Sequence, residues 1–188
     1  MTQCTLCNNC IYKEFPPEID SYFGFEKGSY WIYKNTTNGA LDSLYVNSYF
    51  KTIGSSKEVC TDAAIDQGIT SSNLGESNLG NVFYLNSADM TLAGYDFASN
   101  QINVKETSTV TVLNKRYENS LVLNNCCLSN NCQNSVLEGR CRNISQAPIV
   151  ISKLIFAPNV GIVKWEVNKH PIYGKTTFEL VRYKIVKP

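Results

Sequence analysis

The sequence predicts a mainly β protein: an antiparallel meander that forms a partly open barrel or a sandwich, with at most one or two short helices. Three observations support this fold class. Short segments rich in aromatic and β-branched residues recur along the chain, polar turn residues separate them, and no amphipathic stretch extends beyond three helical turns. The 188 residues suit one domain that can bury a core without covalent cross-links.

We expect a Cys- and Pro-rich arm at residues 1–20 and a single β-rich domain at 21–188, with a Cys-rich loop at 124–142. The arm ends in Phe15-Pro16-Pro17, which favours extended backbone and interrupts helices. The domain then begins close to Tyr22.

The first half of the domain contains one clear hairpin signal. Residues 30–34 are aromatic and β-branched, Asn38-Gly39 is a strong turn pair, and residues 44–53 form the return strand. Residues 56–65 are then expected to form one short helix with a Ser cap, and residues 69–80 a loop. Further strands are expected at 82–85, 90–93, 102–104, 107–113, 121–123 and 149–156.

The C-terminal segment predicts a second hairpin. Pro158-Asn159 forms a turn, since Pro fixes φ and Asn tolerates the left-handed region. From Gly161 to Asn168 apolar and polar residues alternate, as they do in a strand with one face on a core. Residues 169–175 read as a connection and residues 176–186 as the return strand.

Eight cysteines are many for this length, and their number is even. So many thiols indicate disulfides in an exported protein, or metal or redox chemistry in a cytosolic one. We favour disulfides, whose connectivity the sequence does not determine. The candidates are Cys4, Cys7, Cys10, Cys60, Cys126, Cys127, Cys132 and Cys141.

The alternative is a metal site at Cys4-x-x-Cys7-x-x-Cys10. An iron–sulfur run needs a fourth thiolate soon afterwards, and none follows. A zinc site would have to recruit Cys60 or His170 from a distance. We therefore expect no metal and no cofactor.

Composition and charge limit the partners. The net charge is +1, no basic run occurs and no apolar stretch is long enough to span a bilayer, so we expect neither nucleic-acid binding nor a transmembrane segment. The polar surface is dominated by Asn, Ser and Thr, with 21 Asn in total. Residues 1–4 lack the features of a signal peptide, so a signal would have been removed before this numbering begins.

No catalytic constellation is visible. The single histidine, His170, precedes Pro171 in an expected loop, and neither a Gly-x-Ser-x-Gly elbow nor a phosphate-binding loop occurs. We expect no enzymatic activity. Tyr45, Asn47 and Tyr49 would share one face of a strand and form a candidate contact surface if that face is exposed.

Two motifs at opposite ends of the chain carry a family resemblance. Residues 22–33 resemble the opening "Y-x-P-L-x-x-G-x-x-W-x-Y", and residues 156–164 the closing "Y-A-x-G-V-G-L-V-K", of small exported lipoproteins of the Bacteroidetes type, whose function is unknown. Residues 178–185 resemble the terminal strand that follows. The resemblance implies an exported, envelope-associated protein with an antiparallel sheet, similar to periplasmic lipoprotein carriers, and it implies no catalytic residues.

These observations favour a non-catalytic exported or cell-envelope protein: periplasmic, outer-membrane-associated or extracellular. It would bind an apolar small molecule or a partner protein in or on an open barrel. The alternatives are a disulfide-stapled structural or adhesive surface module and a glycan-active enzyme. Apolar binding would require a concave face that is not filled by the protein's own side chains.

Overall fold

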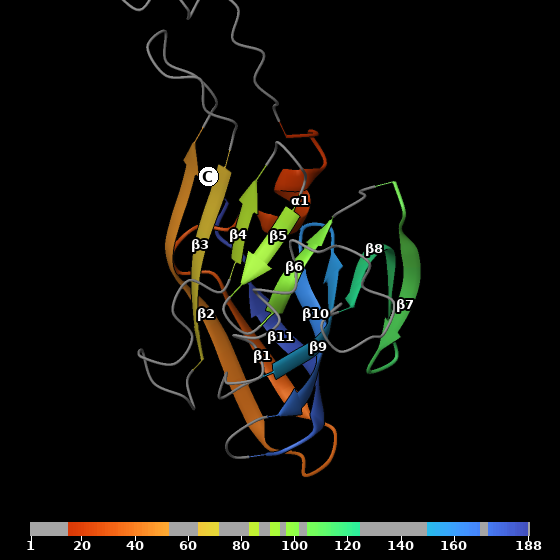
Figure 1. Ribbon diagram of the computed structural model, residues 1–188. Helices are drawn as coiled ribbons and strands as arrows, with labels where there is room; N and C mark the ends of the chain where they lie inside the picture. The colour runs from red at the N-terminus through yellow and green to blue at the C-terminus, as the bar shows by residue number, and fades with distance from the viewer. Residues whose placement is uncertain are drawn as a thin grey trace, which may run out of the picture.

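A computed structural model describes residues 15–52, 64–71, 83–86, 91–94, 97–101, 105–124, 150–169 and 173–187 (Figure 1). Eleven antiparallel strands and one short helix make up the described part of the chain. The helix is α1 (Ile19–Phe23), and the strands are β1 (Tyr30–Asn35), β2 (Leu41–Thr52), β3 (Ala64–Ser71), β4 (Phe83–Asn86), β5 (Thr91–Gly94), β6 (Phe97–Gln101), β7 (Ser108–Val112), β8 (Lys115–Asn124), β9 (Val150–Ala157), β10 (Gly161–Lys169) and β11 (Thr176–Lys184). The predicted fold class is confirmed.

The strands form one sheet in the order β6-β5-β4-β3-β2-β1-β11-β10-β9-β8-β7. Each half is a meander of sequential neighbours, and the pairing of β1 with β11 joins the two ends of the chain at the centre of the sheet. Since β6 and β7 remain the two edges, the sheet is not closed. It is a partly open barrel.

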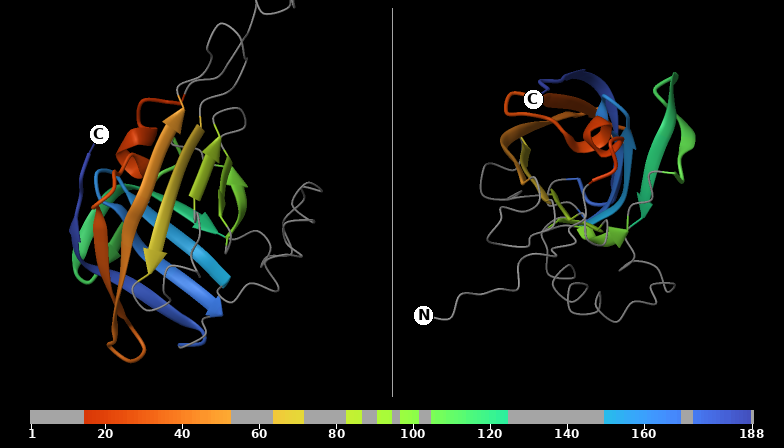
Figure 2. Two further views of the ribbon diagram at one scale, coloured as in Figure 1. Left: turned by 90° about the vertical axis from the view of Figure 1, so that its left-hand side faces the viewer. Right: turned by 90° about the horizontal axis from the view of Figure 1, so that it is seen from above.

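The sheet curls around α1. Seen from above, β1, β2 and β9–β11 curve around the helix, and the β7–β8 hairpin lies on the far side of β9 and β10 from it (Figure 2). Phe23 of α1 packs on Phe156 of β9 with ring centroids 4.8 Å apart, and the Asn159 N–H donates to the Ser21 carbonyl at 2.6 Å. These contacts place α1 over the turn between β9 and β10.

The predicted turn residues shape the hairpins. Pro158 and Asn159 occupy the centre of the β9–β10 turn, where the Val160 N–H donates to the Ala157 carbonyl at 3.2 Å and Asn159 has φ 59°. Proline followed by a residue with positive φ is typical of a type II turn. At the tip of the β7–β8 hairpin, Leu113 and Asn114 both have positive φ, as in a type I′ turn.

The two motifs that carry the family resemblance meet in the core. Trp31 of β1 donates from its indole Nε1 to the Val160 carbonyl at 2.5 Å, and the Tyr33 hydroxyl donates to the Ile162 carbonyl at 2.9 Å. Gly161 lies directly against Trp31 with φ 85°, and a Cβ there would lie 2.9 Å from Trp31 Cζ2. The motifs are therefore complementary halves of one packing contact, which explains their residue types without reference to a ligand.

The structure also corrects parts of the sequence analysis. The helix predicted at 56–65 is wrong at its end, because Ala64 and Ile65 belong to β3; residues 53–63 lie outside the described part. Ile69–Ser71, predicted as loop, also belong to β3. The strands predicted at 82–85, 90–93, 107–113, 121–123 and 149–156 correspond to β4, β5, β7, β8 and β9, whereas β6 is new and residues 102–104 lie outside the described part.

Helix α1 is the other unpredicted element, and it lies across the expected boundary between arm and domain. Ile19 is fully buried, and Phe15 packs against the core. In the described ranges, no helix is long and apolar enough to cross a membrane.

Candidate functional site

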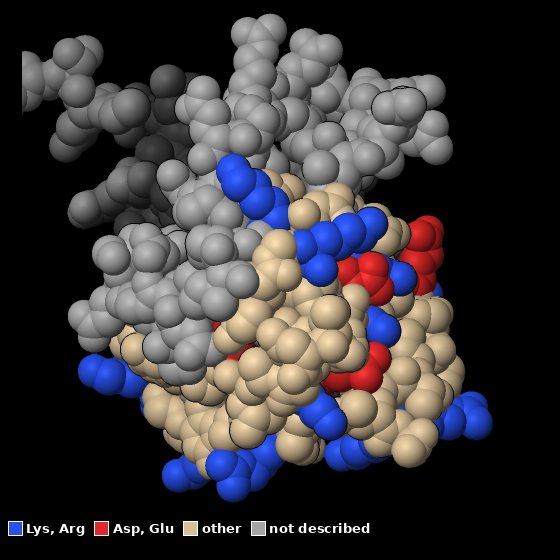
Figure 3. All heavy atoms as spheres, turned by 90° about the horizontal axis from the view of Figure 1, so that it is seen from below, with Lys and Arg blue, Asp and Glu red and all other residues tan. Residues whose placement is uncertain are grey.

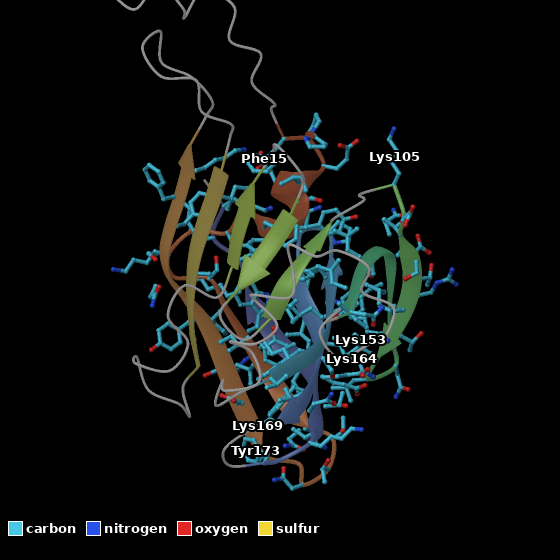
Figure 4. The ribbon with its side chains drawn as sticks, in the orientation of Figure 1. Phe15, Lys105, Lys153, Lys164, Lys169 and Tyr173 are labelled. Atoms are coloured by element: carbon cyan, nitrogen blue, oxygen red, sulfur yellow. The ribbon has the colours of Figure 1, made fainter. Side chains whose placement is uncertain are left out.

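A polar pocket of ≈ 330 Å³ lies at the end of the sheet opposite α1. It forms where the β1–β2 turn, Ser152 of β9, residues 166–168 of β10 and residues 175–177 come together, near the labelled Lys169 and Tyr173 (Figure 4). Its volume falls at the lower end of the range for small-molecule sites, roughly 300–1,000 Å³. The lining residues are Thr36, Thr37, Ser152, Glu166, Val167, Asn168, Lys175, Thr176 and Thr177.

The pocket has an exposed rim and a buried floor. Thr36, Thr37, Asn168 and Lys175 are exposed, whereas Val167 and Thr176 are buried. Figure 3 shows this end from below, with Lys and Arg side chains along the edge of the visible face and others within it beside Asp and Glu side chains. The lining has one acidic and one basic side chain, Glu166 and Lys175, so its formal charges cancel.

The buried side chain of Asn35 organises the floor of the pocket. Its Oδ1 accepts hydrogen bonds from the backbone N–H of Thr37 at 2.8 Å, the N–H of Asn38 at 3.4 Å and the Thr176 hydroxyl at 2.8 Å. An Asn oxygen that accepts from the backbone two residues later forms an Asx-turn. Asn35 thereby ties the β1–β2 turn to the first residue of β11.

These hydrogen bonds determine which of the neighbouring hydroxyl groups donates and which accepts. A carbonyl oxygen cannot donate, so the single Thr176 hydroxyl proton points to Asn35. The Thr37 hydroxyl lies 3.1 Å from the Thr176 hydroxyl and must be the donor in that contact. Thr37 is left with free lone pairs and no free proton, so it can only accept a hydrogen bond from a bound molecule.

The Ser152 hydroxyl also donates its proton within the protein. It donates to the Glu166 backbone carbonyl at 3.0 Å, which leaves its lone pairs as acceptors. The Glu166 carboxylate is a further acceptor, 4.0 Å from Lys153 Nζ and 36% exposed. Lys175 supplies donors only, whereas the Asn168 amide and the Thr36 and Thr177 hydroxyls can each donate or accept. The lining therefore presents hydrogen-bond donors and acceptors at separate places.

Two buried donors lie next to the pocket without partners. Asn35 Nδ2 and Trp165 Nε1 are buried and make no hydrogen bond. Their residues flank Phe178 in one cross-strand row, in which Trp165 stacks on Phe178 at 4.2 Å. Buried N–H groups of this kind usually donate a hydrogen bond to an ordered water molecule.

The residues of the predicted contact surface lie along β2, where Asn47 is exposed and Tyr45 and Tyr49 are half-buried, and the contact surface stays a prediction. A β-bulge lies between Val46 and Ser48, so Asn47 has no counterpart in the ladder to β3. After the bulge, Tyr49 packs against the core, whereas before it Tyr45 lies opposite Tyr30 of β1 and between two buried residues.

The other predicted site residues lie outside the described part of the chain. These are His170 and the disulfide candidates Cys4, Cys7, Cys10, Cys60, Cys126, Cys127, Cys132 and Cys141. The disulfides stay a prediction. In the ranges that the structure describes, no group of three His, Cys, Asp or Glu residues could hold a metal ion.

The shifted pKa values lie away from the pocket. Burial raises the pKa of Tyr33 well above 10.0, with smaller contributions from Asp42 and Tyr117. Burial also raises the pKa values of Tyr22, Tyr49 and Tyr117, and it lowers that of Lys187. None of these groups lines the pocket, and each shift is explained first by packing.

Sequence reasoning missed the pocket residues because they come from four separate segments: 36–37, 152, 166–168 and 175–177. The one local signal was the pair of hydroxyl residues at the end of β1 and at the start of β11, Thr36-Thr37 and Thr176-Thr177. No protein-family model matches the chain, and neither a curated protein nor a solved structure matches it. The resemblance to exported lipoproteins therefore stays a prediction.

Proposed function

We propose that the protein is a non-catalytic exported or cell-envelope binding module that acts through the polar pocket at the end of its sheet opposite α1. The observation that carries this proposal is the buried Asn35 network, which fixes hydroxyl groups on the wall and floor of a pocket of ≈ 330 Å³. Preorganised polar groups reduce the entropic cost of binding. A site built in this way is suited to recognition of a small polar ligand.

An apolar ligand inside the barrel receives less support. The inner-face aromatic residues pack on one another: Tyr33 lies edge-on to Trp165, Trp165 stacks on Phe178 and Tyr173 lies edge-on to Phe178. Trp165 and Phe178 are at most 2% exposed. In the part of the chain with described side chains, this concave face is filled by the protein itself.

Export is proposed from the cysteines and the resemblance. Eight cysteines suit disulfides formed in an oxidising compartment, and the motifs at 22–33 and 156–164 are similar to those of exported lipoproteins.

Native mass spectrometry of the non-reduced protein, followed by denaturation of the same sample, tests this function. We expect a mass deficit of two hydrogens per cystine and a small polar adduct that is lost on denaturation. A lipid-sized adduct would favour the apolar carrier instead. Free thiols with a bound metal would contradict both the disulfides and the export.

A second candidate is a surface module that binds a partner protein. Leu41 and Phe50 of β2 are 60% and 66% exposed, and Val181, bulged out of β11, is 52% exposed. Substitution of Phe50 by Ser should then leave folding intact and weaken capture of a partner by the immobilised protein. Unchanged capture would remove β2 as the binding surface.

A further inference from the structure

We infer that the ligand of the polar pocket is a neutral carbohydrate, bound through vicinal hydroxyl groups; this inference rests on the proposed function. The proposal starts from hydrogen-bond direction. Thr37 and Ser152 have already donated their hydroxyl protons within the protein, so both can only accept from a ligand.

The acceptors Thr37, Ser152 and Glu166 make an anion a poor ligand for this pocket. Phosphate, sulfate and carboxylate groups offer acceptors, which would face the lone pairs of Thr37 and Ser152 and the Glu166 carboxylate. A single lysine, Lys175, opposes them. The pocket therefore lacks the cluster of cations and N–H donors that anion sites use.

A cation or an amine is also a poor match. Such a ligand supplies donors for Thr37, Ser152 and Glu166, but Lys175 would repel it and the donors of Lys175 and Asn168 would remain unused. A hydroxyl group both donates and accepts. Two neighbouring hydroxyl groups on a sugar ring can therefore donate to the acceptors and accept from Lys175 or Asn168 at the same time.

The lining of the pocket agrees with this ligand. Five of its nine residues carry hydroxyl groups, namely Thr36, Thr37, Ser152, Thr176 and Thr177. The exposed rim at Thr36, Thr37 and Lys175 leaves room for the next unit of a chain. The pocket is therefore suited to one unit of a glycan.

The test is saturation-transfer NMR of the full chain with glucose, galactose, mannose, N-acetylglucosamine and their disaccharides, with spermidine and inorganic phosphate as competing classes. We expect transfer from the protein to at least one neutral sugar. Thr37→Val keeps the side-chain shape and removes the acceptor, and its affinity should fall about 5- to 10-fold, as for loss of one hydrogen bond. Ser152→Ala should show a similar loss.

Thr109→Val is the matched control, because Thr109 is an exposed residue of β7 that carries a hydroxyl group and does not line the pocket. Its affinity should equal that of the wild type, and circular dichroism should show all three variants folded. Sugar binding that Thr37→Val and Ser152→Ala leave unchanged would overturn the assignment to this pocket. Binding of spermidine or phosphate, lost in Thr37→Val, would overturn the carbohydrate class and leave the binding module standing; absence of any bound ligand would overturn both.

Discussion

At the α1 end of the sheet, the polar atoms of large aromatic side chains are satisfied by the backbone: Trp31 and Tyr33 donate to the carbonyls of Val160 and Ile162. At the opposite end, the polar atoms belong to small hydroxyl side chains around Asn35, and several of their lone pairs face a pocket. Both ends use hydrogen bonds between β1 and the β10–β11 half of the sheet. Among the described side chains at these two ends, only those at the end opposite α1 leave hydrogen-bonding capacity for another molecule.

This difference suggests that the residues at the α1 end stabilise the fold, whereas those at the opposite end are available for binding. A buried aromatic group with a satisfied donor stabilises the fold and offers nothing to solvent. A hydroxyl group that has donated its proton inward is held rigid while its lone pairs remain available. We therefore expect substitutions at the α1 end to act on folding, and substitutions at the pocket rim to act on binding.

The largest expected effect is that of Gly161→Ala. A Cβ at this position would lie 2.8 Å from Phe25 Cε2 and 2.9 Å from Trp31 Cζ2, and the backbone has φ 85°. Overpacking and left-handed strain together should lower the free energy of unfolding by about 2–4 kcal/mol, measured by urea denaturation.

Gly174→Ala is the matched control for this substitution. Gly174 has φ 66°, but a Cβ there meets no atom within 4 Å. The loss should be about 1 kcal/mol from backbone strain alone. Equal losses for the two variants would contradict the tight packing of Gly161 against the aromatic motif.

The second largest loss of stability is expected for Asn35→Ala, at the end of the sheet opposite α1. This change removes the acceptor of three hydrogen bonds and leaves the Thr176 hydroxyl without its buried partner. We expect a loss of about 2–3 kcal/mol in the free energy of unfolding, together with weaker ligand binding. Asn38→Ala, which removes only one exposed contact to the Ala40 N–H, should cost about 0.5 kcal/mol; a larger cost there would place the organising role outside Asn35.

Tyr33→Phe should have the third largest effect, about 1–2 kcal/mol at neutral pH, because the Ile162 carbonyl loses its buried donor. Since burial raises the Tyr33 pKa above 10.0, the unfolded chain releases this proton at lower pH than the folded protein does. The stabilisation is therefore complete below pH 10 and is lost as the pH rises toward the folded-state pKa. Unfolding curves between pH 8 and 11 should fall less steeply for the variant, and identical slopes would argue against this titration.

The smallest effect is expected for Glu179→Gln. Its carboxylate lies 3.0 Å from Lys164 Nζ, with the two side chains 16% and 24% exposed, so solvent screening is only partial. The loss should be about 1 kcal/mol and should shrink at high salt. Glu118→Gln, in the exposed pair with Arg116, should change stability by roughly 0.2 kcal/mol or less, and a reversed ranking would contradict the role of burial.

The parts of the fold that the sequence predicted are those with local chemical causes. Pro158-Asn159 and Asn38-Gly39 marked turns because their own backbone preferences determine φ, and the alternation after Gly161 marked a half-buried strand. Helix α1 was missed because it spans five residues after two prolines and is held by distant contacts to Phe156 and Asn159.

The site was less accessible to sequence reasoning. The register of β2 shifts at a bulge between Val46 and Ser48, and nothing in the local sequence marks this bulge. The pocket depends on a hydrogen bond between Asn35 and Thr176, which are 141 residues apart. Only the strand order, with β1 beside β11, brings these residues together.

The most direct measurement is a ¹H–¹⁵N chemical-shift titration of the full-length protein with the neutral sugar that shows the strongest saturation transfer. We expect the shifted amides to cluster at residues 36–37, 152, 166–168 and 175–177, with little change at residues 19–31 or 156–161. Shifts concentrated instead on the indole N–H of Trp31 and on the amides of residues 19–31 or 156–161 would place the ligand at the α1 end of the sheet. That result would contradict the division between a structural end and a binding end.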